Sequence, residues 1–128
     1  MNEAAIKKLV AGRWRIVETE VWDKEALDLV ERAFLYFEEG EPTGAFAMIA
    51  IRRGVHYYVS ERDGKPLVER TWQGLDEGRD ELCGRGWATL DPDGKLRGRI
   101  FLHCADDSSF VAERFADAKQ RARRARGR

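Results

Sequence analysis

A histidine and two carboxylates stand close together near the end of the sequence, as His103, Asp106 and Asp107 in the string HCADDS. At this spacing they could meet at one end of a sheet and act as general acid and base or hold a metal ion, with Glu18 or Glu20 contributing. The plainer interpretation is a turn whose short polar side chains hydrogen-bond to the local backbone. We therefore treat these three residues as candidates for catalysis.

Metal and cofactor sites find little support in the sequence. Only two histidines are present, so a zinc site would need to recruit Cys104, and no tetrahedral ligand set is visible. The acidic stretch Gly74–Arg85 lacks the alternating oxygen ligands of a calcium loop, which favours a solvated loop. Gly84-Arg85-Gly86 lacks the helix and the Lys-Ser/Thr pair of a phosphate-binding loop. Its glycines are more typical of a bend or of close approach by another backbone. We expect neither metal nor cofactor.

An arginine on an otherwise apolar strand face is the second candidate for function. In the stretch Pro66–Gln73, Arg70 alternates with Val68 and Trp72, so the three side chains share one face of a strand. If that face is inward, the interior contains a cation. A buried arginine needs a carboxylate, an aromatic ring or an anionic ligand beside it.

The partner of this cation is open at the level of sequence. The apolar alternation of the first strand weakens at its end, so Glu18 or Glu20 could point inward and neutralise Arg70. The alternative is a small, partly apolar ligand with an acidic head group at Arg70 or Arg99. The side chains expected to contact such a ligand are Trp14, Phe46, Met48, Tyr57, Arg70, Trp72, Trp87 and Arg99.

The clearest structural signal is a hairpin within Cys83–Phe110. Two runs typical of strands, Gly84–Leu90 and Lys95–His103, flank Asp-Pro-Asp-Gly, a favourable sequence for a type I turn followed by a left-handed glycine. Direct pairing across the turn places the two cysteines, Cys83 and Cys104, diagonally on one face. A bulge at the glycine shifts the register by one residue and places them on opposite faces. We expect free thiols.

The remaining elements follow from periodicity and turn residues. We expect a short helix over Asn2–Val10 and, after Asp23 as N-cap, another over Lys24–Val30. Gly54 is expected to turn the chain, and Asp63-Gly64 to close a tight hairpin. The expected strands are Arg13–Val21, Ala33–Glu38, Gly44–Ile51, Val55–Arg62, Pro66–Gln73, the two hairpin strands and Ser109–Phe115.

Eight short antiparallel strands in sequence order predict a mainly all-β protein, an up-and-down β-barrel with a short helix after the first strand. A barrel of this strand number is either filled by side chains or holds one small ligand. A β-sandwich is the alternative, but it would require longer crossovers than the chain offers.

A resemblance supports the barrel. Gly12-Arg13-Trp14 resembles the Gly-x-Trp motif of lipocalins and other calycins, where the tryptophan closes one barrel end against a basic side chain of a late strand. Arg99 and Arg114 are the candidates for that side chain. Further strings are similar to an uncharacterised family of short bacterial calycin-like proteins: WQG-x-DE from Trp72, CGRGWA from Cys83, GRIF from Gly98 and H-x-x-DDS from His103. The resemblance implies the fold and transfers no catalytic residue.

Length and charge limit the remaining possibilities. The chain of 128 residues is expected to form one domain over residues 1–115, large enough for a core, followed by a basic tail over 116–128. That tail holds six Lys and Arg residues against one Asp, and is either a solubilising segment or a helix that binds phosphate backbones. No apolar run is long enough to span a membrane and no secretory signal is visible. We expect a cytoplasmic monomer or homodimer.

Overall fold

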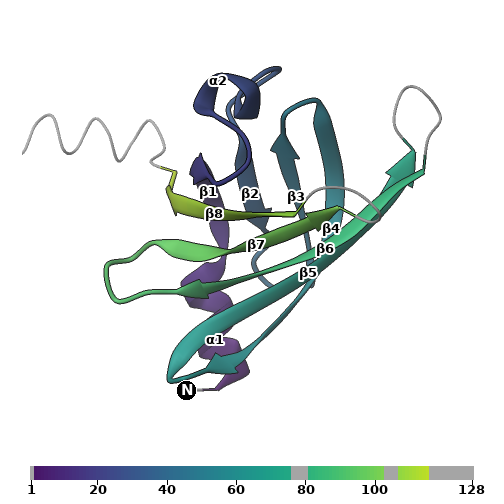
Figure 1. Ribbon diagram of the computed structural model, residues 1–128. Coiled ribbons are helices and arrows are strands. Elements are labelled where there is room, and N and C mark those ends of the chain that lie inside the picture. Colours follow the sequence, from purple (N-terminus) through teal and green to yellow (C-terminus); the bar gives the residue numbers. More distant parts are fainter. Residues whose placement is uncertain (1, 76–80, 103–106, 116–128) are drawn as a thin grey trace, which may run out of the picture.

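The computed structural model of the chain describes residues 2–75, 81–102 and 107–115. These ranges contain two helices, α1 (Glu3–Val10) and α2 (Lys24–Leu27). The strands are β1 (Gly12–Thr19), β2 (Phe34–Phe37), β3 (Thr43–Met48), β4 (Ile51–Arg62), β5 (Lys65–Leu75), β6 (Glu81–Leu90), β7 (Leu96–Leu102) and β8 (Asp107–Arg114). Each strand pairs with the next in antiparallel fashion, and β8 pairs with β1, so the sheet closes into a barrel (Figure 1).

The predicted architecture is therefore confirmed: an eight-stranded antiparallel up-and-down barrel with a short helix after the first strand. Asp23 caps α2 as expected, because its carboxylate accepts a hydrogen bond from the Ala26 amide at 2.8 Å. The helix ends at Leu27 rather than Val30. Asp28 turns away from the helix, and its carboxylate accepts a hydrogen bond from the Ala33 amide at the start of the next strand.

The hairpin of β6 and β7 takes the bulged register. Leu90 lies opposite Leu96, Asp91 N donates to Lys95 O at 2.9 Å, and Gly94 has a φ of 84°. Glycine fits this position because it adopts a left-handed conformation without a steric penalty. Of the two cysteines, Cys83 is a free thiol on β6, while Cys104 lies outside the described residues.

The prediction that Gly54 turns the chain is wrong. The turn lies at Ile49-Ala50, and Gly54 sits inside β4 opposite Ala45. Ile49 adopts a φ of 57°, an unusual conformation for a β-branched residue. Two contacts hold it there: its amide donates to Leu27 O at 2.8 Å, and its side chain packs against the core. Tertiary contacts thus place the turn where no glycine marks it.

The acidic residues at the end of β1 do not point inward. The register of β1 with β8 shifts between Ile16 and Glu18, and both Glu18 and Glu20 are exposed. Glu20 approaches the Arg99 guanidinium at 3.5 Å on the outside of the barrel. Neither residue is therefore the internal carboxylate that could have neutralised Arg70.

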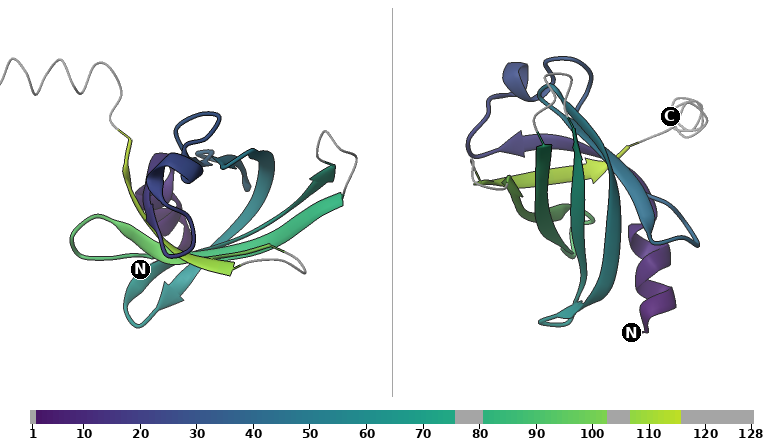
Figure 2. Two further views of the ribbon diagram at one scale, coloured as in Figure 1. Left: turned by 45° about the horizontal axis from the view of Figure 1, so that its top comes forward. Right: turned by 90° about the vertical axis from the view of Figure 1, so that its right-hand side faces the viewer.

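Helix α1 covers one end of the barrel, and α2 lies at the opposite end (Figure 2). The Trp14 indole on β1 donates to Val10 O at 2.8 Å, and the Arg114 guanidinium on β8 stacks 3.9 Å from the Trp14 ring. Arg114 also donates to the carbonyls of Leu9 and Ala11 at the end of α1. Of the two basic residues expected beside Trp14, Arg114 occupies the position, whereas Arg99 does not.

The wall of the barrel opens between β4 and β5. Their ladder extends from the hairpin at Arg62 and Lys65 to the pair His56 and Thr71, where it ends although both strands continue. Over the same distance β3 stays paired with β4, and β5 stays paired with β6. Figure 1 shows the result, since the far ends of β5 and β6 lean away from β3 and β4.

Candidate ligand-binding site inside the barrel

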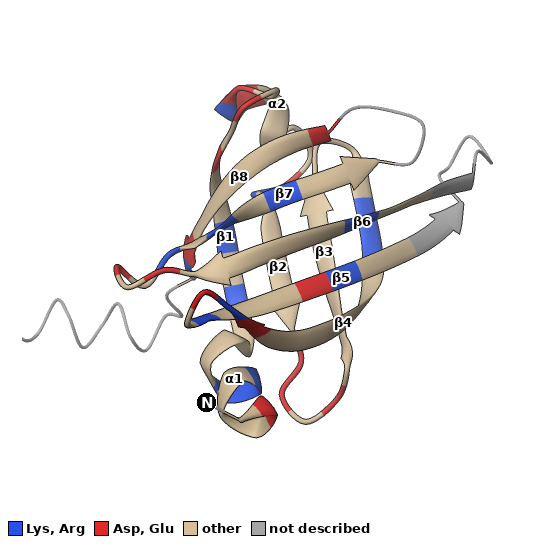
Figure 3. Ribbon diagram, turned by 60° about the horizontal axis from the view of Figure 1, so that its bottom comes forward, with Lys and Arg blue, Asp and Glu red and all other residues tan. Residues whose placement is uncertain are grey.

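Arg70 lies in the interior, as the alternation of β5 predicts. Its side chain is 1% exposed, and it stands directly opposite the buried Tyr57 of β4. Figure 3 shows an acidic and a basic position side by side on β5. Of the adjacent residues Glu69 and Arg70, the first is exposed and the second is buried. The barrel core therefore contains a guanidinium group.

The other strands leave room for this group. Gly86 of β6 lies opposite Arg70, and a Cβ atom at that position would stand 2.8 Å from the Arg70 Cζ. On the far side, the ring of Phe110 from β8 lies 5.2 Å from the Cζ, within cation–π range. A side chain on Gly86 would thus displace the guanidinium.

No described residue neutralises Arg70. None of its three guanidinium nitrogens has a hydrogen-bond partner, and none of the ion pairs within the described ranges includes it. Burial lowers the pKa of Arg70 to about 10, which leaves the group protonated at neutral pH. A charge that is removed from water without a counter-ion is costly, so the site is suited to an anion.

Trp72 is the next inward residue on β5. Its ring packs on Phe46 with 4.7 Å between centroids, and its side chain is 4% exposed. Gly84 of β6 lies opposite, and a Cβ there would stand 2.5 Å from the Trp72 Cζ2. The buried indole nitrogen has no hydrogen-bond partner among the described residues. Arg70 and Trp72, the donor pair, thus present unpartnered N–H groups inside the barrel.

The donor pair explains why glycines stand on both sides of Arg85 in Gly84-Arg85-Gly86. Both glycines point inward beneath the two large side chains of β5, while Arg85 points outward and stacks on Phe101 at 4.8 Å. The sequence interpretation of these glycines as sites of close approach is correct in kind. A backbone carbonyl of β7 and a side chain of β5 both approach each of the two glycines closely.

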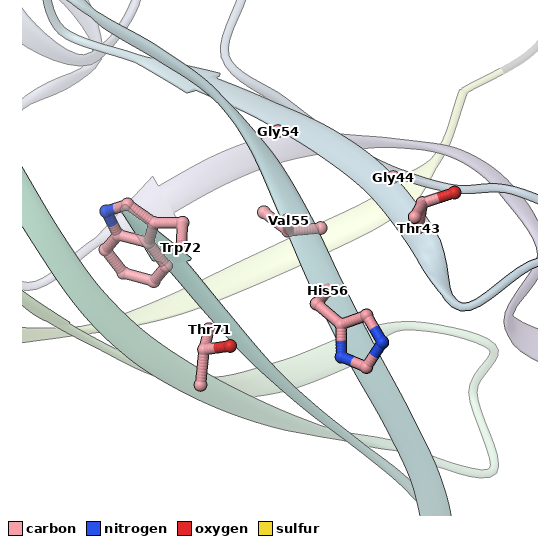
Figure 4. A pocket seen from close by; sticks show the side chains of 7 residues that line it. All are labelled: Thr43, Gly44, Gly54, Val55, His56, Thr71 and Trp72. Atoms are coloured by element: carbon pink, nitrogen blue, oxygen red, sulfur yellow. The ribbon is translucent and has the colours of Figure 1, made fainter. Parts of the chain in front are cut away.

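A pocket of about 490 Å³ lies at the opening between β4 and β5. Trp72 forms one side, and the His56 ring and the Thr43 hydroxyl lie toward the other (Figure 4). Val55 and Gly54 of β4 complete the wall beside the strand opening. Trp72 lines this pocket, and Arg70 is the adjacent inward residue on β5.

Arg53 is an interior residue that the sequence pattern did not predict. It shares the inward side of β4 with Val55 and lies opposite the buried Phe46. Its Nη1 donates to Arg52 O, whereas its Nε and Nη2 are buried without a partner in the described part of the chain. The incorrect turn at Gly54 hid this residue, because it placed Arg53 in a loop. A strand that begins at Ile51 would have revealed its inward position.

Several predicted ligand contacts lie close to the donor pair and others do not. Phe46, Met48 and Tyr57 belong to the buried core. The Tyr57 hydroxyl donates to Glu38 O at 2.7 Å, and burial raises its pKa. Trp14 is occupied at the end covered by α1.

Trp87 and Arg99 lie on the outer face of the barrel. Trp87 is half-buried beneath Arg62, whose Cζ lies 4.9 Å from its ring. The Arg99 guanidinium pairs with the carboxylate of Asp107 at 2.6 Å, also on the outside. These two residues are therefore separated by the barrel wall from Arg70.

Of the three residues considered as candidates for catalysis, the structure describes one. Asp107 is exposed at the start of β8 in its pair with Arg99, while His103 and Asp106 lie outside the described residues. Within the described ranges no three His, Cys, Asp or Glu side chains gather as metal ligands. No described helix has the length and apolar character needed to cross a membrane.

Comparisons with known proteins identify no relative of this chain. No protein-family model, no curated protein and no solved structure matches this chain. What the structure itself supports is an eight-stranded antiparallel β-barrel, consistent with a calycin-like fold.

Proposed function

We propose that the protein is a binding module for a small, partly apolar molecule with an acidic head group. The observation that carries this proposal is the Arg70 guanidinium, which is buried, protonated at neutral pH and without a partner among the described side chains. A carboxylate can accept two parallel hydrogen bonds from a guanidinium and neutralise its charge. The ligand thereby supplies the counter-ion that the described part of the chain does not provide.

The apolar part of the ligand has a place beside the head group. Phe110 lies beside Arg70, and Phe46 and Val55 lie near Trp72, so the surroundings of the donor pair are largely aromatic or aliphatic. The pocket of about 490 Å³ falls in the size range of small-molecule sites. It lies at the strand opening, so we propose that a ligand enters there and passes Trp72 to reach Arg70.

Titration calorimetry with a matched pair of ligands tests the head group. We expect decanoate to bind at least about 10-fold more tightly than 1-decanol, because only the carboxylate can form a charge-assisted pair with Arg70. The Arg70→Met variant keeps the length of the side chain and should lose this preference. The Arg99→Met variant, altered at an outer-face arginine, should bind as the wild type does.

Two results contradict the proposal. If the wild type binds decanoate and 1-decanol equally, no cation in the protein pairs with the carboxylate. If Arg70→Met binds decanoate with unchanged affinity, a cation other than Arg70 pairs with the carboxylate. Loss of decanoate binding in Arg99→Met would identify that cation as Arg99.

A further inference from the structure

We propose that the bound acid carries a neutral oxygen acceptor part-way along its chain, as in a keto or hydroxy acid, and that this oxygen accepts a hydrogen bond from the Trp72 indole. The inference rests on the proposed function, since it extends the Arg70 site by one further contact. It names the class of ligand more narrowly than the charge of Arg70 alone does.

The first observation is the contrast between the two interior tryptophans. Trp14 is 1% exposed, and its indole N–H donates to Val10 O at 2.8 Å. Trp72 is buried to a similar degree, yet its indole nitrogen has no acceptor among the described residues. Buried indole N–H groups usually find a partner, and leaving one unpaired is costly. An acceptor on a ligand satisfies it.

The second observation is the alignment of the donor pair. Arg70 and Trp72 are consecutive inward residues of β5, so their Cα atoms stand roughly 7 Å apart along the strand. Each lies above an inward glycine of β6, Gly86 and Gly84 respectively. A chain-like ligand that runs along β5 can therefore pair its carboxylate with Arg70 and present an oxygen to Trp72.

The Trp72 indole selects a neutral oxygen rather than a second charge at this point. Its ring packs directly on the buried ring of Phe46 and offers no charge to a ligand. The indole N–H is itself uncharged and a single donor. A carbonyl or hydroxyl oxygen matches it without bringing another charge into the core.

Titration calorimetry with decanoate and keto acids of equal chain length, with the carbonyl at successive odd carbons, tests this inference. At least one keto acid should bind wild type about 5- to 10-fold more tightly than decanoate does, which is the effect of one added hydrogen bond. Trp72→Phe keeps a ring against Phe46 but removes the N–H. It should bind decanoate with little change and lose the preference for the keto acid.

A measurement on the wild type avoids dependence on the folding of the variant. In proton–nitrogen NMR spectra, the indole N–H signal of Trp72 should shift on addition of the preferred keto acid and much less with decanoate. The indole signal of Trp14 serves as the internal control, because its acceptor is the Val10 carbonyl.

The outcomes separate this inference from the proposed function. If decanoate binds through Arg70 but no keto acid binds more tightly, the inference is overturned and the proposed function stands. A preference for the keto acid over decanoate that persists in Trp72→Phe also overturns it. So does a dicarboxylate of the same chain length that the wild type and Trp72→Phe both prefer to decanoate to the same extent. Absence of decanoate binding by the wild type overturns both.

Discussion

Arg70 is a cation held where water does not reach it, opposite Tyr57 and beneath Phe110. Its burial opposes folding of the ligand-free protein, because the charge has lost its hydration and no side chain in residues 2–75, 81–102 and 107–115 serves as its counter-ion. Residues that reduce stability in this way persist where they serve binding. The same side chain should therefore affect stability and binding in opposite directions.

We predict that Arg70→Met stabilises the ligand-free protein. Methionine fills a similar volume with no charge to desolvate, so the free energy of unfolding should rise by roughly 1 to 4 kcal/mol. Urea denaturation of the two proteins in the absence of ligand measures the change. Arg99→Met is the matched control, because its ion pairs are exposed and their loss should change the urea midpoint little.

A loss of stability in Arg70→Met would contradict this account. It would mean that the protein itself stabilises the guanidinium, through the Phe110 ring or through a counter-ion that Arg70→Met leaves unpaired. A ligand would then not be required at this site.

At the residue scale, the sequence correctly predicts which side chains of β5 face the interior, but it does not do so for β6. Alternation with Val68 and Trp72 correctly places Arg70 inside. Size suggested that Trp87 is interior too, yet the inward residues of β6 opposite Arg70 and Trp72 are the glycines Gly86 and Gly84. Arg70 and Trp72 already fill the space in front of these residues, so Trp87 faces outward. Such compensation between neighbouring strands depends on register, which a strand considered alone does not reveal.

Among the elements, α1 is attached to the barrel through one arginine of β8. Arg114 stacks on Trp14 and donates to two carbonyls at the end of the helix. Burial lowers the pKa of Arg114, so these contacts hold a partly desolvated charge. This arrangement closes the barrel end away from the strand opening.

We predict that Arg114→Lys destabilises the protein almost as much as Arg114→Ala, by about 1 to 3 kcal/mol, because an ammonium group cannot both stack on the ring and donate to two carbonyls. Hydrogen exchange should show faster opening of α1 in both variants. Full retention of stability by Arg114→Lys would show that the charge alone suffices and would contradict the proposed geometry.

A second connection joins two hairpins near the same end. The Asp91 carboxylate pairs with Lys65 of β5 at 3.0 Å and with Arg97 of β7 at 2.7 Å. The hydrogen bond from Arg97 is the largest cause of a lowered pKa of Asp91, and Arg97 also lowers the pKa of Asp93 to about 2. Both carboxylates therefore favour the folded state while they are ionised.

The pH dependence follows from these shifts. A carboxyl group with a lowered pKa in the folded state contributes stability above its unfolded pKa of about 4, and this contribution is lost as the pH falls toward 2. We predict that Asp91→Asn costs roughly 1 kcal/mol at about pH 7 and reduces the loss of stability on acidification. Urea midpoints across this range measure both effects. An identical acid response in the two proteins would contradict the role of Asp91.

Turn chemistry explains which connections could be predicted. Asp63-Gly64 and Asp91-Pro92-Asp93-Gly94 contain residues that suit left-handed backbone, and both hairpins form there. At Ile49 the backbone is left-handed because of contacts to α2 and the core, which leave no local signal. The prediction from Gly54 failed for this reason, and it removed Arg53 from the list of interior candidates.

In the whole molecule, one end of the barrel is covered and its wall is open elsewhere, so a ligand has one expected point of entry. Helix α1 and Arg114 cover one end of the barrel, while β4 and β5 separate beyond His56 and Thr71 (Figures 1 and 2). The pocket lies at this separation and is lined by Trp72. The buried Arg70 is the next inward residue of β5, on the side of Trp72 away from the strand opening. A ligand that enters through the wall would reach the acid-binding position last. The head group is therefore expected to lie deepest.

The most direct test observes Arg70 itself while a ligand binds. In protein prepared with isotope-labelled arginine, the side-chain N–H signal of Arg70 can be identified by its absence in Arg70→Met. On titration with decanoate, this signal should shift strongly to a saturating value, as a guanidinium does on pairing with a carboxylate, while those of the outer-face Arg97 and Arg99 stay in place. An unchanged Arg70 signal at saturating decanoate would contradict the central claim that this buried cation binds the acidic head group.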